Sequence, residues 1–210
     1  MKNELWSTVV GSHMWGMQKS DSDMDIFVCY LAPTKDILVG KNPKSIEDKF
    51  KESKIDMTTH ELGKVVRMLL VGNVNFVWGV TSPNVASSSP LHKELLFIYK
   101  QNAAKNCFFS IDGLFRHNYR DYVEKVDKPK PKRLVMMYRT LQFGQHVLDT
   151  GKFEYKSVDF DVDIEMLKSA HEDLKSAYEA SDLPEKPDST PFLEFLVRAR
   201  ILELSDALWH

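Results

Sequence analysis

The feature that most constrains the fold is a nearly continuous apolar segment, DIFVCYL, at residues 25–31. Short runs rich in Val, Ile, Phe and Tyr are typical of β-strands, and an apolar run with few polar interruptions is typical of a buried strand. A second β-prone segment precedes it at residues 6–10, and a third lies within SKIDMTTHEL at residues 53–62. The first half of the chain is therefore predicted to contain a sheet with a buried strand.

Helical patterns follow these strands and fill the second half of the chain. Thr59 is predicted to be the N-cap of a helix that runs through ELGKVVRMLLVGN to a stop at Gly72-Asn73. Apolar residues recur at helical intervals in five further segments. These are residues 91–100, 107–125, 133–151, 163–181 and 191–208, with a proline-broken linker at 127–132 and a loop at 181–190. The pattern predicts an α/β amino-terminal half and an all-helical carboxy-terminal half.

Length, net charge and cysteine count limit the class of protein but say little about any reaction it catalyses. A chain of 210 residues forms one moderate or two small domains. The net charge of −2 argues against a surface coated with positive charge for non-specific nucleic-acid binding, although it permits a local basic groove. Two cysteines, Cys29 and Cys107, are too few for a disulfide framework or a cysteine zinc site. Without a signal-peptide pattern or a long apolar run, we expect a cytoplasmic protein with no membrane partner.

The first candidate for chemistry is the acidic pair in SDMDIFV. Side chains alternate across a strand, so Asp23 and Asp25 are predicted to share one face while Met24 and Ile26 point into the core. Two adjacent carboxylates repel each other unless a cation lies between them, and Mg²⁺ prefers carboxylate oxygens. The pair is therefore a candidate metal site. A solvated acidic pair at a strand edge is the alternative.

Gly11 and Ser12 extend this candidate site. A glycine lets backbone approach a ligand closely, and the segment SHMWGMQ is predicted to open a short helix whose amides attract phosphate. The Ser12 hydroxyl adds one more donor. The order strand, Gly-Ser, short helix and Asp-x-Asp would place a phosphate site beside a metal site. The alternative for Ser12 alone is a simple helix N-cap.

Asp56, in SKIDMTT, is the candidate for a third carboxylate on an adjacent strand. Three converging carboxylates suit two metal ions roughly 3.5–4 Å apart, one at the attacking hydroxyl and one at the phosphates. The alternative is that Asp56 is a turn or cap residue.

These motifs together resemble the DNA polymerase β-type nucleotidyltransferase superfamily. The order is hydrophobic-Gly-Ser, ten residues between Ser12 and Asp23, the Asp-x-Asp pair and a later strand Asp. Within that superfamily, GSHMWGMQKSDSDMDIFVCYLAP is similar to the RNA-repair-pathway DNA polymerase β family of predicted nucleotidyltransferases. The likeness continues through DMTTHELGKVVRMLLVGNVNFVWGVTSP and, more loosely, KRLVMMYRTLQFGQHVLDTGKF. The chain departs from it at Lys19, where proline is frequent, and at Asn73-Val74-Asn75, where relatives often have Asn-Pro.

The resemblance implies a fold and a reaction. The fold is α/β (α+β), with a mixed-sheet nucleotidyltransferase catalytic domain at residues 1–105 and a helical domain at 106–210 that closes the nucleotide and acceptor cleft. The expected reaction joins a nucleoside monophosphate from an NTP to a hydroxyl and releases pyrophosphate. By likeness, the acceptor is an RNA or tRNA 3′ end. Nucleotidylation of a small molecule or protein, a non-catalytic nucleotide- or RNA-binding regulator, and a plain α/β interaction module are the alternatives.

The resemblance also assigns roles to residues. Gly11 and Ser12 would hold the triphosphate. Asp23, Asp25 and Asp56 would bind two Mg²⁺ or Mn²⁺ ions, with Asp56 also orienting or deprotonating the acceptor hydroxyl. In the helical half, Lys132, Tyr138 and Arg139 are candidates for contacting the nucleotide. Further basic candidates are Lys64, Arg67, Arg116 and Arg120. A solvated helix surface is the alternative for each of these basic residues.

Overall fold

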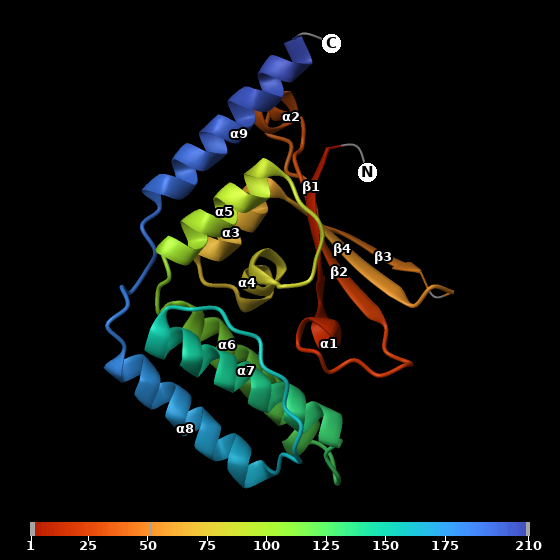
Figure 1. Cartoon of the computed structure of the whole chain (residues 1–210), viewed down its shortest axis with the longest axis vertical. Coiled ribbons are helices and arrows are strands. Elements are labelled where there is room, and N and C mark those ends of the chain that lie inside the picture. Colours follow the sequence, from red (N-terminus) through yellow and green to blue (C-terminus); the bar gives the residue numbers. More distant parts are fainter. Residues whose placement is uncertain (1–2, 51, 209–210) are drawn as a thin grey trace. The chain divides into compact units, whose positions relative to one another are not determined.

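Strand β2 is central in the sheet, which explains why its sequence is so apolar. The computed structural model describes residues 3–50 and 52–208. Within them, a five-stranded sheet has the order β3-β4-β2-β1-β5 (Figure 1). The strands are β1 (Glu4–Val10), β2 (Met24–Tyr30), β3 (Ile46–Phe50), β4 (Ile55–Glu61) and β5 (Val85–Ser87). β2 runs antiparallel to β1 and parallel to β4, so the sheet is mixed, as predicted.

Helices α4 and α5 cover the face of the sheet that carries Asp25. The helices around the sheet are α1 (Gly11–Met14), α2 (Thr34–Leu38), α3 (Leu62–Leu70), α4 (Val74–Thr81), α5 (Pro90–Gln101) and α9 (Thr190–Leu208). Thr8 donates a 2.7 Å hydrogen bond to the carbonyl of Gly79 in α4, and Trp6 stacks on His92 of α5. Phe27, which is paired with Thr8, lies on the same face and is buried.

This corrects the predicted orientation of β2. Met24 is 36% exposed and Ile26 is only half-buried, whereas Phe27 and Cys29 are buried. The prediction that Met24 and Ile26 point into the core was wrong, because α4 and α5 cover the other set of alternating side chains. Asp25 therefore lies at the end of the face that the helices bury.

The third predicted strand is longer than its sequence pattern suggested. β4 continues to Glu61, and α3 begins at the next residue. Thr59 lies inside β4 and is 1% exposed, so its prediction as a helix N-cap was wrong. The strand continues because Thr59 is paired with Val28 of β2 and with Ile46 of β3.

The contacts divide the chain into two units, of which the first contains the whole sheet. The first unit comprises residues 1–70, 75–102 and 188–210, and the second comprises residues 71–74 and 103–187. Helix α9 belongs to the first unit because Arg200 forms an ion pair with Glu61 of β4 and donates a 2.8 Å hydrogen bond to the carbonyl of Ala32. The two units therefore alternate along the chain instead of meeting at a single boundary at residue 105. The roles of the two predicted domains stay predictions, and residues 1–2, 51 and 209–210 of those domains lie outside the described residues.

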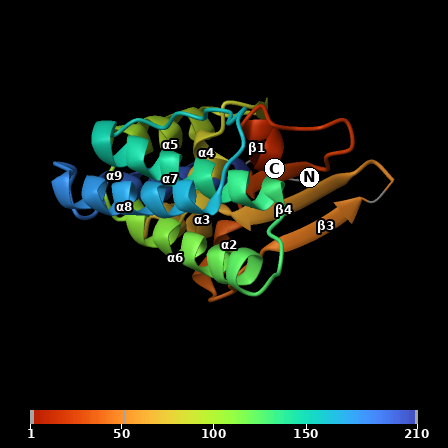
Figure 2. The same ribbon diagram turned by 90° about the horizontal axis from the view of Figure 1, so that it is seen from below.

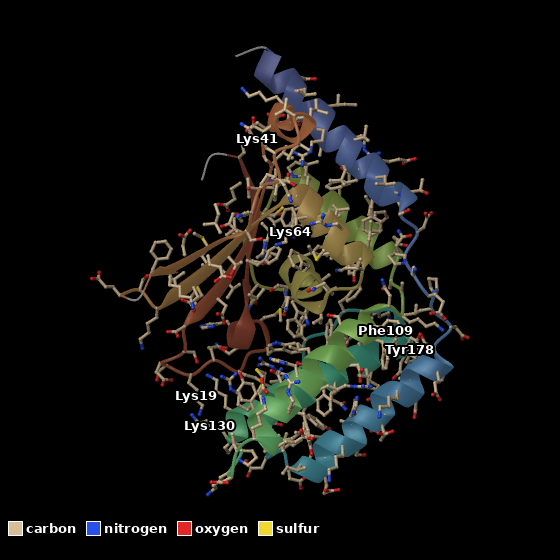
Figure 3. All side chains as sticks on the ribbon, turned by 180° about the vertical axis from the view of Figure 1, so that it is seen from behind. Lys19, Lys41, Lys64, Phe109, Lys130 and Tyr178 are labelled. Atoms are coloured by element: carbon tan, nitrogen blue, oxygen red, sulfur yellow. The ribbon has the colours of Figure 1, made fainter. Side chains whose placement is uncertain are left out.

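The second unit is built from helices. They are α6 (Cys107–Tyr119), the π-helical turn η1 (Arg120–Glu124), α7 (Pro131–Thr150) and α8 (Ile164–Ala180). Helix α7 ends at Thr150, one residue before its predicted end at Gly151, which is its C-cap residue. Its Gly144 lies against Ile111 of α6 and Leu174 of α8, which brings the three helices close together. Phe109 and Tyr178 lie side by side at one end of this unit, with ring centroids 5.5 Å apart (Figure 3).

Among residues 3–50 and 52–208, no helix is long and apolar enough to cross a membrane.

Candidate active site

A row of in-register residues crosses four strands of the sheet and forms the centre of the candidate site. Asp25 of β2 is paired with Asp56 of β4, and Asp56 is paired with Lys49 of β3. On the other side, Asp25 is paired with Val10, the last residue of β1. Side chains of directly paired residues lie on the same face of a sheet, so the two carboxylates are neighbours. The edge strand β3, which holds Lys49, is visible beside β4 in Figure 2.

Gly11 brings backbone directly against one of these carboxylates. It follows Val10 at the end of β1 and has a positive φ of 62°, a conformation that glycine adopts without steric cost. A Cβ atom placed on Gly11 would lie 1.9 Å from Oδ2 of Asp25. The carboxylate therefore occupies the space that any other residue at position 11 would need for its side chain. The Asp25 carboxylate therefore lies directly against the strand-to-helix turn.

The turn that follows is supported from behind by the α4–β5 connection. Ser82 donates a 2.6 Å hydrogen bond to the carbonyl of Val9, and the Asn84 side chain donates a 2.9 Å bond to the carbonyl of His13. Ser12 is the second residue of α1 rather than its N-cap, so the N-cap alternative was wrong. The Ser12 carbonyl accepts hydrogen bonds from the amides of Trp15 and Met17. The short helix predicted after Gly11 is confirmed.

Asp23 lies next to the amino-terminal end of β2. It lies one residue before β2, and it is exposed. Strand alternation therefore does not place it on the same face as Asp25. Between residues 3 and 208, residue 51 apart, no group of three or more His, Cys, Asp or Glu side chains is arranged to hold a metal ion. The structure brings Asp25 and Asp56 together, and the metal-binding role of Asp23 stays a prediction.

Asp56 lies inside a strand, so the alternative that it is a turn or cap residue was wrong. Its side chain is 42% exposed, and its Oδ2 is 3.8 Å from Nζ of Lys49, which is 66% exposed. Strand pairing brings these two charges together. Sequence analysis missed Lys49 because SIEDKF carries charged residues at both alternating positions and shows little strand pattern. The only available signal was its place in a lysine-rich segment before Asp56.

Further along the strands, the face of the sheet that carries Asp25 and Asp56 is aromatic and carries a buried histidine, His60. His60 lies four residues after Asp56 on β4, and its ring is 4.9 Å from that of Phe27 and 4.6 Å from that of Phe76. Burial, helped by the nearby Lys64 ammonium, lowers the pKa of His60 to about 4. Its Nδ1 is 2.7 Å from Oγ of Ser45, which also accepts a hydrogen bond from Lys64. The Lys64 ammonium is thus hydrogen-bonded to Ser45 at this end of the sheet (Figure 3).

The three nucleotide-contact candidates of the helical half all lie on α7, in the second unit. Lys132 is exposed near the start of α7, and Arg139 is half-buried. The Tyr138 ring makes an edge contact with Phe160, with ring centroids 5.7 Å apart. The contact of these side chains with a nucleotide stays a prediction.

Comparisons with known proteins place the chain in a family. The sequence match defines a DNA polymerase beta-like protein. The chain belongs to the RNA repair pathway DNA polymerase beta family, whose model matches residues 3–198.

Two individual proteins are also similar to this chain. An uncharacterized protein from Methanocaldococcus jannaschii is 27% identical over 157 residues, a match that covers 73% of this chain and 64% of that relative. The chain therefore matches less than two thirds of the relative's length. A crystal structure of a nucleotidyltransferase-like protein from Exiguobacterium sibiricum 255-15 aligns over 98% of this chain and 70% of that chain, with 12% identity and a TM-score of 0.36. The family match carries the assignment.

Proposed function

We propose that the protein is a Mg²⁺-dependent nucleotidyltransferase that moves a nucleoside monophosphate from an NTP to a hydroxyl and releases pyrophosphate. The observation that carries the proposal is the paired register of Asp25 and Asp56, with Asp25 packed directly against the Cα of Gly11. Membership of the RNA repair pathway DNA polymerase beta family supports the class of reaction.

The residues fit a divalent cation by their chemistry. Asp25 and Asp56 present carboxylate oxygens from neighbouring strands, and Mg²⁺ prefers such ligands while keeping other positions for water or phosphate. Gly11 leaves space beside Asp25 that a Cβ would otherwise fill. Asp23, exposed just before β2, would supply a third carboxylate to a site with two ions. Bound Mg²⁺ would supply charge neutralisation at the phosphates and at the attacking oxygen.

The chain's own residues would then position the reactants. The backbone at Gly11 and the Ser12 hydroxyl would contact the triphosphate next to Asp25. Asp56 would accept the proton of the acceptor hydroxyl as its oxygen attacks the α-phosphorus. A new P–O bond forms to the acceptor, and the P–O bond to pyrophosphate breaks. Positioning and electrostatic stabilisation supply most of the catalysis in such transfers, so no covalent enzyme intermediate is needed.

The acceptor we propose is an RNA, in particular an RNA or tRNA 3′ end. The family description supports a role in RNA repair, and the same chemistry would serve a hydroxyl of a small molecule or a protein side chain. Lys132, Tyr138 and Arg139 of α7 are proposed to contribute further contacts to the nucleotide.

The test is label transfer from each of the four NTPs, radiolabelled at the α-phosphorus, to cellular RNA with Mg²⁺ or Mn²⁺. Asp25→Asn and Asp56→Asn should each lower the transfer rate at least about 100-fold, because a group that acts on the reacting atoms is lost. Asp48→Asn is the matched control. Asp48 is paired with Met57, next to Lys49 and Asp56 in the register, and therefore points to the opposite face of the sheet. The label-transfer rate of Asp48→Asn should stay within about twofold of the wild-type rate.

Three outcomes decide the proposal. Transfer that is lost in both site variants and kept in Asp48→Asn supports it. Tight NTP binding with no transfer to RNA, small molecules or protein points instead to a non-catalytic regulator. Full transfer activity in Asp25→Asn and Asp56→Asn contradicts the site assignment.

A further inference from the structure

Lys49 lies at the outer end of the row that crosses the sheet. Its strand, β3, is an edge strand in the described part of the chain, because the sheet order begins with β3. Lys49 is paired with Asp56, and its ammonium is 3.8 Å from the carboxylate. With side chains 66% and 42% exposed, this is a loose surface pair, the kind that contributes about 0–1 kcal/mol to stability. The ammonium is therefore available to a ligand at little cost.

The order of groups along the row determines which ligand Lys49 meets. Gly11 and Asp25 lie at one end, Asp56 lies in the middle, and Lys49 lies at the other end. Adjacent strands are about 4.8 Å apart, so Lys49 starts roughly 10 Å from Asp25 on the side away from Gly11. A triphosphate held at Gly11 would thus occupy the opposite end of the row. A molecule that brings its hydroxyl to Asp56 from the sheet edge would pass Lys49.

The charges beside Lys49 limit how many phosphates this edge holds. Glu47 lies two residues before Lys49 on β3, shares its face and is exposed. Its carboxylate repels a second phosphate further along the edge. Lys54, on the far side of the hairpin, points its ammonium at the carbonyl of Asp21, 3.5 Å away. Lys49 is therefore placed to hold a single phosphate next to Asp56.

We infer that Lys49 binds a backbone phosphate of a single-stranded nucleic acid whose terminal hydroxyl lies at Asp56. The inference rests on the proposed function, because it takes Asp56 as the residue that receives the acceptor hydroxyl. A strand is favoured over a small molecule since β3 is an exposed edge, across which a long acceptor can continue away from the site. One phosphate adjoins each terminal nucleotide, which matches Lys49, the one cation among the residues of β3, Ile46–Phe50.

The experiment measures binding, so that it does not depend on turnover. Fluorescence anisotropy follows labelled single-stranded RNA oligonucleotides of two different sequences, titrated with the full chain at several salt concentrations. Lys49→Gln should weaken binding about 5- to 10-fold for both sequences, and it should reduce the slope of log K against log salt by about 0.7, the value for one phosphate contact. Lys49→Arg, which keeps the charge, should stay within about twofold of the wild type.

Lys44→Gln is the matched control, because it removes the same charge from an exposed residue just before β3. It should leave both affinity and salt slope within about twofold of the wild type. Calorimetric titration with Mg²⁺–NTP is the second control, and Lys49→Gln should bind NTP like the wild type.

The result that overturns the inference is RNA binding by Lys49→Gln that equals the wild type, or an equal loss in Lys44→Gln. A loss of NTP affinity in Lys49→Gln also overturns it, because the cation would then belong to the triphosphate. A wild-type chain that binds no single-stranded RNA at low salt excludes it outright. Failure of the proposed function is read separately, from NTP label transfer and from Asp25→Asn and Asp56→Asn, so the two failures are distinguishable.

Discussion

The carboxylate of Asp25 fills the place of a side chain that Gly11 does not have. A Cβ at position 11 would lie 1.9 Å from Oδ2 of Asp25 and 2.9 Å from its carboxyl carbon. Val10 and Asp25 are directly paired, so the end of β1 and the start of β2 fix this contact through strand register. A residue with any side chain at position 11 would have to displace the carboxylate, which makes the pair a sensitive test of the site.

Gly11→Ala should damage both stability and catalysis. The substitution places a Cβ in the left-handed region, at a cost of about 1–2 kcal/mol, and forces the Asp25 carboxylate to move. NTP-dependent transfer should fall at least about 100-fold, because catalytic geometry tolerates little displacement. Denaturant unfolding and label transfer measure the two effects.

Gly16→Ala separates the two effects. Gly16 also has a positive φ, of 65°, but a Cβ there would meet nothing within 4 Å. This variant should lose a similar 1–2 kcal/mol of stability while its transfer rate, measured on folded protein, stays within about fivefold. Equal losses of activity in the two variants would show that backbone strain, and not the clash with Asp25, disables the site.

The ion pair between Glu61 and Arg200 should be a main stabilising contact of the first unit. The Glu61 side chain is 5% exposed and that of Arg200 is 16% exposed, and Glu61 also accepts a 2.6 Å hydrogen bond from the amide of Gly63. Arg200→Met leaves a buried carboxylate without its partner, so it should cost about 3–5 kcal/mol of the free energy of unfolding. Urea denaturation measures the loss.

Arg198→Met is the control on the same helix. Arg198 pairs with Glu94 at 2.5 Å, but both side chains are substantially exposed. An exposed pair is worth about 0–1 kcal/mol, so this variant should unfold nearly like the wild type. The double variant Glu61→Met/Arg200→Met should recover much of the loss of Arg200→Met. If Arg198→Met and Arg200→Met lose the same free energy of unfolding, burial is not the reason that the Glu61–Arg200 pair stabilises the fold.

The stability of the chain should fall in mildly acidic solution because of His60. Its pKa is about 4 in the folded state, below the ordinary value of about 6.5 that applies after unfolding. Between these values the unfolded chain binds the extra proton, so the contribution is full above pH 6.5 and is lost as the pH falls toward 4. Allowing for partial solvent screening, we expect a loss of about 1–2 kcal/mol from this group.

Thermal or urea unfolding across pH 4–7 measures the effect of His60. His60→Phe should remove this part of the pH dependence. Lys64→Met should reduce it, because the nearby ammonium helps to lower the pKa of His60. Ser45→Ala keeps the buried imidazole and should retain the slope. A pH dependence in His60→Phe identical to that of the wild type would contradict the assignment.

The central strands and the long helices could be predicted because their patterns are local. β1, β2 and β4 carry short apolar or β-branched runs, and α5, α7 and α8 repeat apolar residues at helical intervals. β3 could not be predicted, because IEDKF has charged residues on both faces and its stability comes from pairing with β4. Helix α4 was also missed, since VNFVWGVT is apolar all round and shows no period.

The candidate site was predictable as a set of residue types but not as a geometry. The Gly-Ser and Asp-x-Asp motifs are visible in the sequence, and the family match supports their interpretation. The contact between Gly11 and Asp25, and the register that joins Asp25, Asp56 and Lys49, depend on pairing between distant segments. Which face the helices cover is likewise a tertiary property, which is why Met24 and Ile26 were assigned to the wrong side.

The return of α9 to the first unit sets an order of events during protein synthesis. Residues 103–187 of the second unit are synthesised before residues 188–208, which include the Arg200 that pairs with Glu61 of β4. The unit whose strands are translated first is therefore completed last. A nascent chain arrested before residue 188 would expose the apolar residues that pack against α9, and it would depend on chaperones for longer than its early strands suggest.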